Sequence, residues 1–218
     1  MPSDPFQMVM IHRGFRTEFS NIASLVRAVE PGDATRRKIV GHYLENMILV
    51  LHHHHAAEDE MLFSALSARL PDSDTPLDSA GRDHADIERI FERATALRLS
   101  WQRGGDAGEA EDLGRALDDL SGVAGEHFDR EEREVVPLIG EHLTEAEWQA
   151  FIDRGGAYVN PANVWFALAY AGLVLRDATP EERVRFSASL PLPLRIVLKT
   201  LGRHAYASYQ KKLYGHVG

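Results

Sequence analysis

Apolar residues recur at helical spacing along nearly the whole chain, and we find no convincing stretch that alternates apolar and polar residues as a half-buried strand does. This pattern predicts four long helices, over residues 5–29, 34–70, 77–101 and 109–142. Short polar segments separate them, at residues 31–33, 71–75 and 104–105. Consecutive helices joined by short loops pack antiparallel. We therefore expect an all-α fold built on an up-down-up-down four-helix bundle.

The remaining residues are also patterned as helices. Two Thr-x-x-Glu sequences, beginning at Thr144 and Thr179, have the spacing of an N-terminal capping box. Pro161 starts a very apolar helix that ends at about Leu175, and a final helix follows Pro191 and Pro193. We expect additional C-terminal helices, with the bundle over residues 1–143 and an extension over 144–218.

Charge divides at the same boundary. Residues 1–143 hold 15 Lys/Arg and 27 Asp/Glu, a net of -12, whereas residues 144–218 hold 9 and 6, a net of +3. The last 28 residues contain five Lys/Arg and no acid. Two interpretations stay open for them: a helical cap whose basic side faces solvent or docks on the acidic bundle, or a helix that binds a membrane surface or a partner.

Composition excludes several classes of protein. The net charge of -9 argues against nucleic acid as a partner, because wrapping it requires a basic field. The chain has no run of about 18 apolar residues, so no transmembrane segment is expected. Its first residues lack the layout of a signal peptide and it contains no Cys, which favours a cytoplasmic location. The absence of Cys also excludes zinc fingers, thiolate iron–sulfur sites and thiol nucleophiles.

Two segments share a histidine–carboxylate pattern. His54 is followed by Glu58 and His127 by Glu131, in each case with a further acid one residue later. Four residues make about one helical turn, so each His and Glu stack on one face. The neighbours of His127 at helical spacing are apolar, so this face points into the core, where a charged Glu is costly unless it binds a cation. Imidazole and carboxylate without sulfur suit iron, manganese or zinc.

The run of four histidines at residues 52–55 offers two registers. We choose His54 with Glu58, because His54 has the more continuous apolar stripe, and keep His55 with Asp59 as the alternative. Each of the other two long helices also carries one histidine on an apolar stripe. The candidate metal ligands are therefore His12, His54, Glu58, His84, His127 and Glu131. Glu88, four residues after His84, is interpreted as a solvated or outer acid, with a role as a further ligand as the alternative, and the histidines at 42, 142, 204 and 216 are interpreted as surface or outer groups.

The order His, His-x3-Glu, His, His-x3-Glu over four helices resembles the hemerythrin-like (HHE cation-binding) domains, over about residues 5–142. The resemblance implies two iron ions in the bundle, a non-haem di-iron centre bridged by the carboxylates and by an oxo or hydroxo group, with manganese or zinc as the alternatives. It also implies an exchangeable position for a small diatomic ligand or peroxide. Glu88 stands where the oxygen-carrying hemerythrins have a second histidine on the third helix, and their fourth-helix pair is more widely spaced and ends in Asp. These differences favour the bacterial hemerythrin-like subgroup, and the last 75 residues loosely resemble helical tails on actinobacterial relatives.

Three functions fit this ligand set. The first is a protein that binds or senses dioxygen, nitric oxide or peroxide. The second is a di-iron enzyme, either catalase-like in decomposing peroxide or reducing O2 or NO, and the third is iron handling or storage. The sequence leaves the reaction, the in vivo metal and the oligomeric state open. Ferritin-like di-iron proteins are excluded, because they need Glu-x-x-His pairs that this chain lacks.

Overall fold

The computed structural model describes residues 2–70, 76–160, 162–190 and 192–215. Within these ranges the chain is helical and contains no β-strand, only an isolated bridge between Pro2 and Thr144. The expected all-α class is confirmed. The predicted loop at 71–75, the predicted helix start at Pro161, Pro191 and His216 lie outside the described residues.

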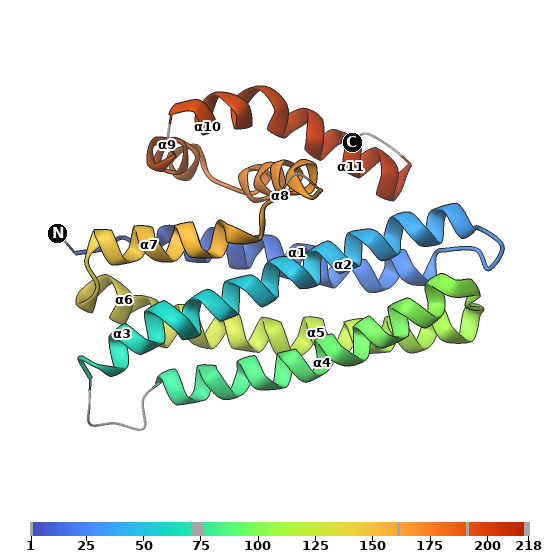
Figure 1. The fold of residues 1–218 in the computed structure, drawn as a ribbon, viewed down its shortest axis with the longest axis horizontal. Helices are drawn as coiled ribbons and strands as arrows, with labels where there is room; N and C mark the ends of the chain where they lie inside the picture. Colours follow the sequence, from blue (N-terminus) through green and yellow to red (C-terminus); the bar gives the residue numbers. More distant parts are fainter. Residues whose placement is uncertain (1, 71–75, 161, 191, 216–218) are drawn as a thin grey trace.

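Four long helices form the bundle, and each runs antiparallel to the next along the chain (Figure 1). They are α1 (Phe6–Arg27), α2 (Ala34–Ala57), α4 (Pro76–Gly104) and α5 (Ala107–Glu134). The side chains of Asp33 and Asp106 cap α2 and α5 by accepting hydrogen bonds from main-chain N–H groups of the first turn. Gly104 ends α4 with a positive φ of 145°, which only glycine adopts readily.

Two of the predicted helices are locally modified toward one end of the bundle, where Figure 1 shows α3 and α6. The second continues from α2 through a π-helical turn (η1, Glu58–Phe63) into α3 (Ser64–Ser67). The fourth breaks at Val135 and resumes as α6 (Val136–His142). Pro137 explains the break, because it has no N–H to donate to the preceding turn.

Further helices follow the bundle, as expected. They are α7 (Glu145–Gly155), the short 3-10 turn η2 (Gly156–Tyr158), α8 (Val164–Arg176), α9 (Pro180–Ser189), α10 (Leu192–Val197), the π-helical η3 (Leu198–Gly202) and α11 (Arg203–Tyr214). Both predicted capping boxes form, at Thr144 and at Thr179. These caps end the preceding loops and start α7 and α9.

The buried apolar residues fall into two clusters along the bundle. The larger includes Phe15, Leu51 and Phe128, and the smaller, near α3 and α6, includes Met8 and Leu62. On each long helix the predicted metal ligands lie between residues of the two clusters. A layer of buried polar side chains therefore interrupts the core.

The C-terminal helices complete both clusters. Phe151 of α7 belongs to the smaller cluster, whereas Tyr170 of α8 and Leu213 of α11 belong to the larger one. Ion pairs also cross from the extension to the bundle, such as Arg154 to Glu60 at 2.7 Å. A domain boundary at residue 143 stays a prediction, and the packing on both sides of it is continuous.

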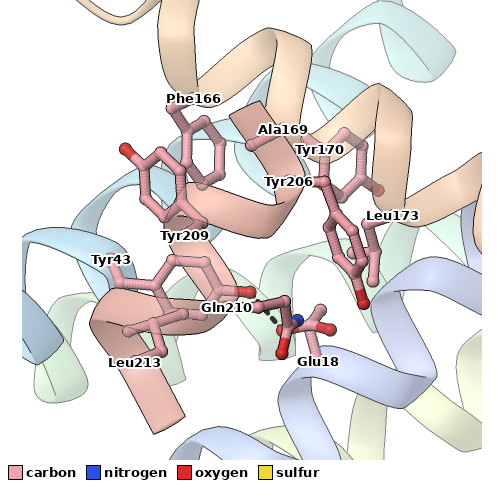
Figure 2. Close-up of a pocket in the computed structure, with 10 residues that line it drawn as sticks. All are labelled: Glu18, Tyr43, Phe166, Ala169, Tyr170, Leu173, Tyr206, Tyr209, Gln210 and Leu213. Atoms are coloured by element: carbon pink, nitrogen blue, oxygen red, sulfur yellow. Dashed lines mark hydrogen bonds between the residues drawn. The ribbon is translucent and has the colours of Figure 1, made fainter. Parts of the chain in front are cut away.

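The seam between bundle and extension contains a buried pair of polar side chains (Figure 2). The Tyr43 hydroxyl of α2 donates a hydrogen bond to the Glu18 carboxyl of α1, under aromatic rings of α8 and α11. The void among these residues is only about 10 Å³. Burial raises the pKa of the Glu18 carboxyl, an effect that the Tyr43 hydrogen bond partly offsets.

This pair should make stability depend on pH. A folded-state pKa above the unfolded value means that the contribution of Glu18 is present at acid pH and is lost as pH rises. We expect Glu18→Gln, which keeps an oxygen for Tyr43, to flatten the fall in the free energy of unfolding above about pH 5. We expect Tyr43→Phe to lower that free energy by about 1–3 kcal/mol, because it leaves a buried carboxyl without its donor. Urea titrations at several pH values measure both effects, with Glu30→Gln, an exposed carboxyl, as the control. An unchanged slope in Glu18→Gln would contradict this account.

None of the described helices is both long and apolar enough to cross a membrane.

Candidate metal centre

Seven buried imidazole and carboxylate side chains meet in the layer between the two apolar clusters. None is more than 6% exposed. They come from all four long helices and from the π-helical turn, and they are His12, His54, His55, Glu58, His84, His127 and Glu131. They form two groups, and in each group the potential ligand atoms lie within 4.8 Å of one another.

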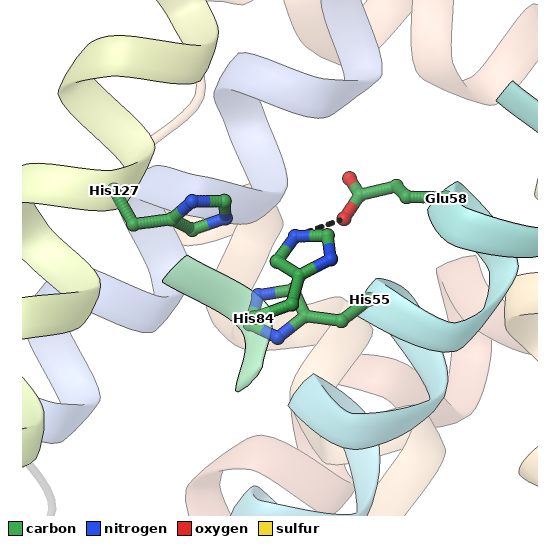
Figure 3. A group of neighbouring side chains, drawn as sticks. All are labelled: His55, Glu58, His84 and His127. Atoms are coloured by element: carbon green, nitrogen blue, oxygen red, sulfur yellow. Dashed lines mark ion pairs between the residues drawn. The ribbon is translucent and has the colours of Figure 1, made fainter. Parts of the chain in front are cut away.

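The first group consists of His55, Glu58, His84 and His127 (Figure 3). The rings of His55 and His84 are stacked, with centroids 4.1 Å apart. The ring of His127 stands edge-on to both, at 5.0 Å from His55 and 4.8 Å from His84. Three imidazoles thus converge beside one carboxylate.

The second group consists of His12, His54, Glu58 and Glu131. Its two imidazole Nε2 atoms, of His12 and His54, lie 3.1 Å apart. The two histidines approach from neighbouring helices, α1 and α2. Glu131 reaches the group from α5, one turn after His127.

Both carboxylates lie between the groups. Glu58 turns Oε1 toward His54 Nε2, at 3.1 Å, and Oε2 toward His84 Nε2, at 3.5 Å. Glu131 Oε2 lies 3.4 Å from His12 Nε2 and 3.6 Å from His127 Nε2. Each carboxylate therefore faces one histidine of either group, so it could offer an oxygen to a cation held in either of them.

A second set of carboxylates orients the imidazoles from outside. Asp59 Oδ1 lies 2.8 Å from His84 Nδ1, and Glu132 Oε1 lies 3.1 Å from His12 Nδ1. An Nδ1–H that donates to a carboxylate leaves the Nε2 lone pair directed inward. These acids are the ones that directly follow Glu58 and Glu131. The repeated histidine–carboxylate pattern includes Asp59 and Glu132. It does not show that each of them contacts a histidine on another helix, because that depends on how the helices are oriented.

Aromatic rings surround the polar layer. Phe128 stacks on His12 at 4.5 Å between centroids, and Phe63 stacks on His84 at 5.4 Å. Phe15 and Phe151 lie 5.5 Å and 6.2 Å from His54. Because Phe151 belongs to α7, the extension contributes to the wall of the site and helps to exclude water from it.

Burial dominates the ionisation of these side chains in the absence of a metal. It raises the pKa of the Glu58 carboxyl well above its usual range, an effect that the neighbouring Glu131 increases. It raises the pKa of Glu131 to about 8, with the charge of Glu132 as the next cause. It lowers the pKa of His54 and His55 well below the usual range, and that of His127 to about 2. The lowered pKa values keep His54, His55 and His127 as neutral donors, and a cation would favour the ionised carboxylates.

The hydrogen bonding of the donor atoms also indicates that these side chains fit a metal ion. Several of its buried atoms have no hydrogen-bond partner among the described residues, although such atoms are normally satisfied. They are both carboxylate oxygens of Glu58 and of Glu131 and the Nε2 atoms of His55, His84 and His127. A cation held in each group would satisfy these atoms. The nitrogen and oxygen donors suit iron, manganese or zinc and do not choose among them.

All six predicted ligands lie in one or other group, and the structure adds His55. The sequence suggests His54 and His55 as alternative registers, but in the structure the two residues belong to different groups. Adjacent helical residues point about 100° apart, and the two groups lie on the two sides of Glu58, so both directions lead to a site. That these side chains bind metal stays a prediction.

Other polar residues near the four consecutive histidines at 52–55 lie outside the two donor groups. Glu88 forms an ion pair with His52 at 2.9 Å, and both side chains are about half exposed. His42 is also exposed, beside Glu45. Neither Glu88 nor His42 belongs to the two groups of donors.

A helical fold that surrounds buried imidazole and carboxylate donors is typical of cation-binding helical proteins. A family model described as the hemerythrin HHE cation binding domain matches residues 6–139, so this chain belongs to that family. The match ends within α6 and leaves the extension outside it. Neither the search of curated proteins nor that of solved structures finds a match to the chain.

Proposed function

We propose that the chain holds two iron ions in these groups and binds or senses a small ligand, such as dioxygen, nitric oxide or peroxide. The observation that carries this proposal is the pair of buried donor groups that share Glu58, with Glu131 also facing both. Bound iron would supply redox chemistry and an exchangeable coordination position. Five imidazoles and two carboxylates offer fewer donor atoms than two octahedral ions take, so room remains for an external ligand.

The surrounding side chains favour small, uncharged ligands. Four phenylalanine rings border the histidines, and they offer no polar group that would stabilise the charge of a charged ligand. Asp59 and Glu132 hold His84 and His12 in one orientation, so ligand exchange need not disturb them. Phe151 of α7 touches His54, and Tyr170 of α8 lies 5.6 Å from Phe15, which gives the extension direct contact with the surroundings of the site.

The decisive experiment is metal analysis of the full chain purified without added metal, combined with its absorption spectrum. We expect about two iron ions per chain, as the two donor groups require. We also expect the spectrum of the reduced protein to change reversibly with dioxygen or nitric oxide, and amide hydrogen exchange in α7 and α8 to change with it. Zinc alone, or no metal, would refute the iron site. Iron that is indifferent to every ligand would refute the binding function and leave iron handling.

A further inference from the structure

Large apolar side chains are exposed at high density on α9, α10 and η3. Six of the eleven exposed large apolar residues in the described part of the chain lie within residues 184–201. The most exposed are Val184 at 70%, Leu192 at 64% and Ile196 at 55%. The other three are Leu194, Val197 and Leu201. A gathering of this kind marks a contact surface, because folded chains rarely leave such residues together in water.

Basic side chains line a groove beside these residues. The groove has a volume of about 600 Å³ and lies between α8, α9 and the helix that runs from α10 into α11. Its cations include Arg183, Arg195, Lys199 and Arg203, and its apolar residues include Leu175, Phe186, Leu190 and Leu198. The groove therefore combines an apolar surface with concentrated positive charge.

Within the part of the chain that the structure describes, no acidic side chain forms an ion pair with Arg183, Arg195, Lys199 or Arg203. Among the described residues, the ion pairs of this region join Arg176 to Asp177, Arg13 to Glu182 and Arg185 to Asp4. None of the ion pairs in the described ranges involves the four groove cations. Arg183 and Arg195 instead donate to main-chain carbonyls at the ends of α8 and α9, which holds the guanidinium groups in place without neutralising them.

Exposed apolar and basic side chains follow one another along the outer helix. This helix passes from α10 through the π-helical η3 into α11, and Leu192, Ile196, Lys199 and Arg203 are all exposed on it. Two apolar positions come first and two basic positions follow. The sequence from Leu192 to Gly215 contains no acidic residue. Figure 1 shows this helix outside α8, and α8 itself packs on α1 of the bundle.

We propose that this surface docks on an anionic lipid bilayer. We call it the α10 surface: the six exposed apolar residues together with Arg183, Arg195, Lys199 and Arg203. Aliphatic side chains enter the interface between headgroups and acyl chains, and neighbouring cations attract anionic lipids. The bilayer supplies at once the apolar environment and the negative charge that the α10 surface lacks.

The distribution of charge supports this occupant over a symmetric contact between the α10 surfaces of two copies of the chain. Two α10 surfaces facing each other would bring eight uncompensated cations together, which costs free energy. The acidic bundle lies on the far side of α8, and at physiological salt a charge is screened over about 8 Å, so its repulsion from the lipid is weak. The proposal is independent of the metal and of the function proposed for it.

The test measures binding of the metal-loaded full chain to vesicles by co-sedimentation. We expect binding to vesicles of equal parts phosphatidylglycerol and phosphatidylcholine, weakened by salt, and little binding to phosphatidylcholine alone. Lys199→Gln should lower the partition coefficient about fivefold, the effect of one surface cation. Ile196→Ser should lower it about tenfold, because it removes inserted apolar surface. Both positions are exposed, so neither change disturbs the core.

Matched variants on the bundle separate a local surface from a general effect of charge or hydrophobicity. Arg93→Gln changes the net charge as Lys199→Gln does, and Leu99→Ser removes an exposed apolar side chain as Ile196→Ser does. Both should bind vesicles like the original chain. Absence of vesicle binding, equal binding to both lipid compositions, or equal losses in the bundle variants would overturn the proposal. So would a dimer in lipid-free solution that Ile196→Ser dissociates, because a second copy would then cover the surface.

Discussion

Replacing Glu58 by alanine is expected to abolish metal binding at both groups while leaving the helices intact. The two oxygens of this carboxylate face His54 on one side and His84 on the other, at 3.1 and 3.5 Å, so one substitution removes a donor from each group. The metal content should fall from about two ions per chain to well below one. Elemental analysis measures the loss, and circular dichroism verifies that the chain remains helical.

Two matched variants give this prediction its specificity. His84→Ala removes a donor from the first group only, so we expect it to keep part of the metal. Glu88→Ala removes a carboxyl of the same helix that pairs with His52 at the surface, so its metal content should be unchanged. Metal retained in full by Glu58→Ala would contradict the shared-carboxylate arrangement, as would an equal loss in Glu88→Ala.

Removing the metal is expected to lower stability, and increasingly so as pH rises. In the metal-free chain the buried Glu131 must keep its proton, with a pKa of about 8 against 4.5 for the ordinary carboxyl. Its contribution is present below pH 4.5 and is lost between 4.5 and about 8. At neutral pH the metal-free chain therefore loses stability, because burial opposes the ionisation of this carboxyl. Bound metal removes this loss, because it favours the ionised carboxylate.

The histidines act in the opposite direction. Burial lowers the pKa of His127 to about 2, so its contribution in the metal-free chain is present above pH 6.5 and is lost as pH falls below that value. Acid also displaces metal, because ligands must be deprotonated to bind it. The difference in Tm between metal-loaded and chelated protein should therefore grow from about pH 5 to about pH 8.

Thermal melts of both forms across this range test the expectation. In the chelated protein, Glu131→Gln should flatten the fall in Tm at higher pH, whereas Glu30→Gln, an exposed carboxyl, should not. A Tm difference that shrinks as pH rises would show that the buried carboxylates are not what the metal stabilises.

Much of the fold and of the donor set could be predicted from local patterns. Helical spacing of apolar residues marks a helix wherever it occurs, and the capping boxes at Thr144 and Thr179 form where their spacing indicated. A His and a Glu one turn apart share a face in any helix, which brought the pairs His54–Glu58 and His127–Glu131 into the predicted set. Each of these inferences depends only on residues within a few turns.

The rest required contacts between distant segments. His55 was an alternative to His54 because the apolar pattern of one helix indicates a single buried face. In the structure three other helices surround this helix, so His54 and His55 each contact a different donor group. The π-helical turn that begins at Glu58 and the break at Val135 also had no clear local signature, apart from Pro137. Asp59 and Glu132 gained their contacts with His84 and His12 only when the helices were assembled.

The sequence by itself determined that the chain forms amphipathic helices with histidines and carboxylates on their buried stripes, because helical periodicity and ligand chemistry are local properties. Only the tertiary structure decided that Glu58 and Glu131 lie between two groups of histidines, because the direction of each oxygen depends on how four helices cross. It also decided that α7 and α8 complete the core, while the four cations of the α10 surface form no ion pair among the described residues. The predicted boundary at residue 143 separates an acidic segment from a basic one, whereas apolar side chains of both segments are buried in the same core clusters.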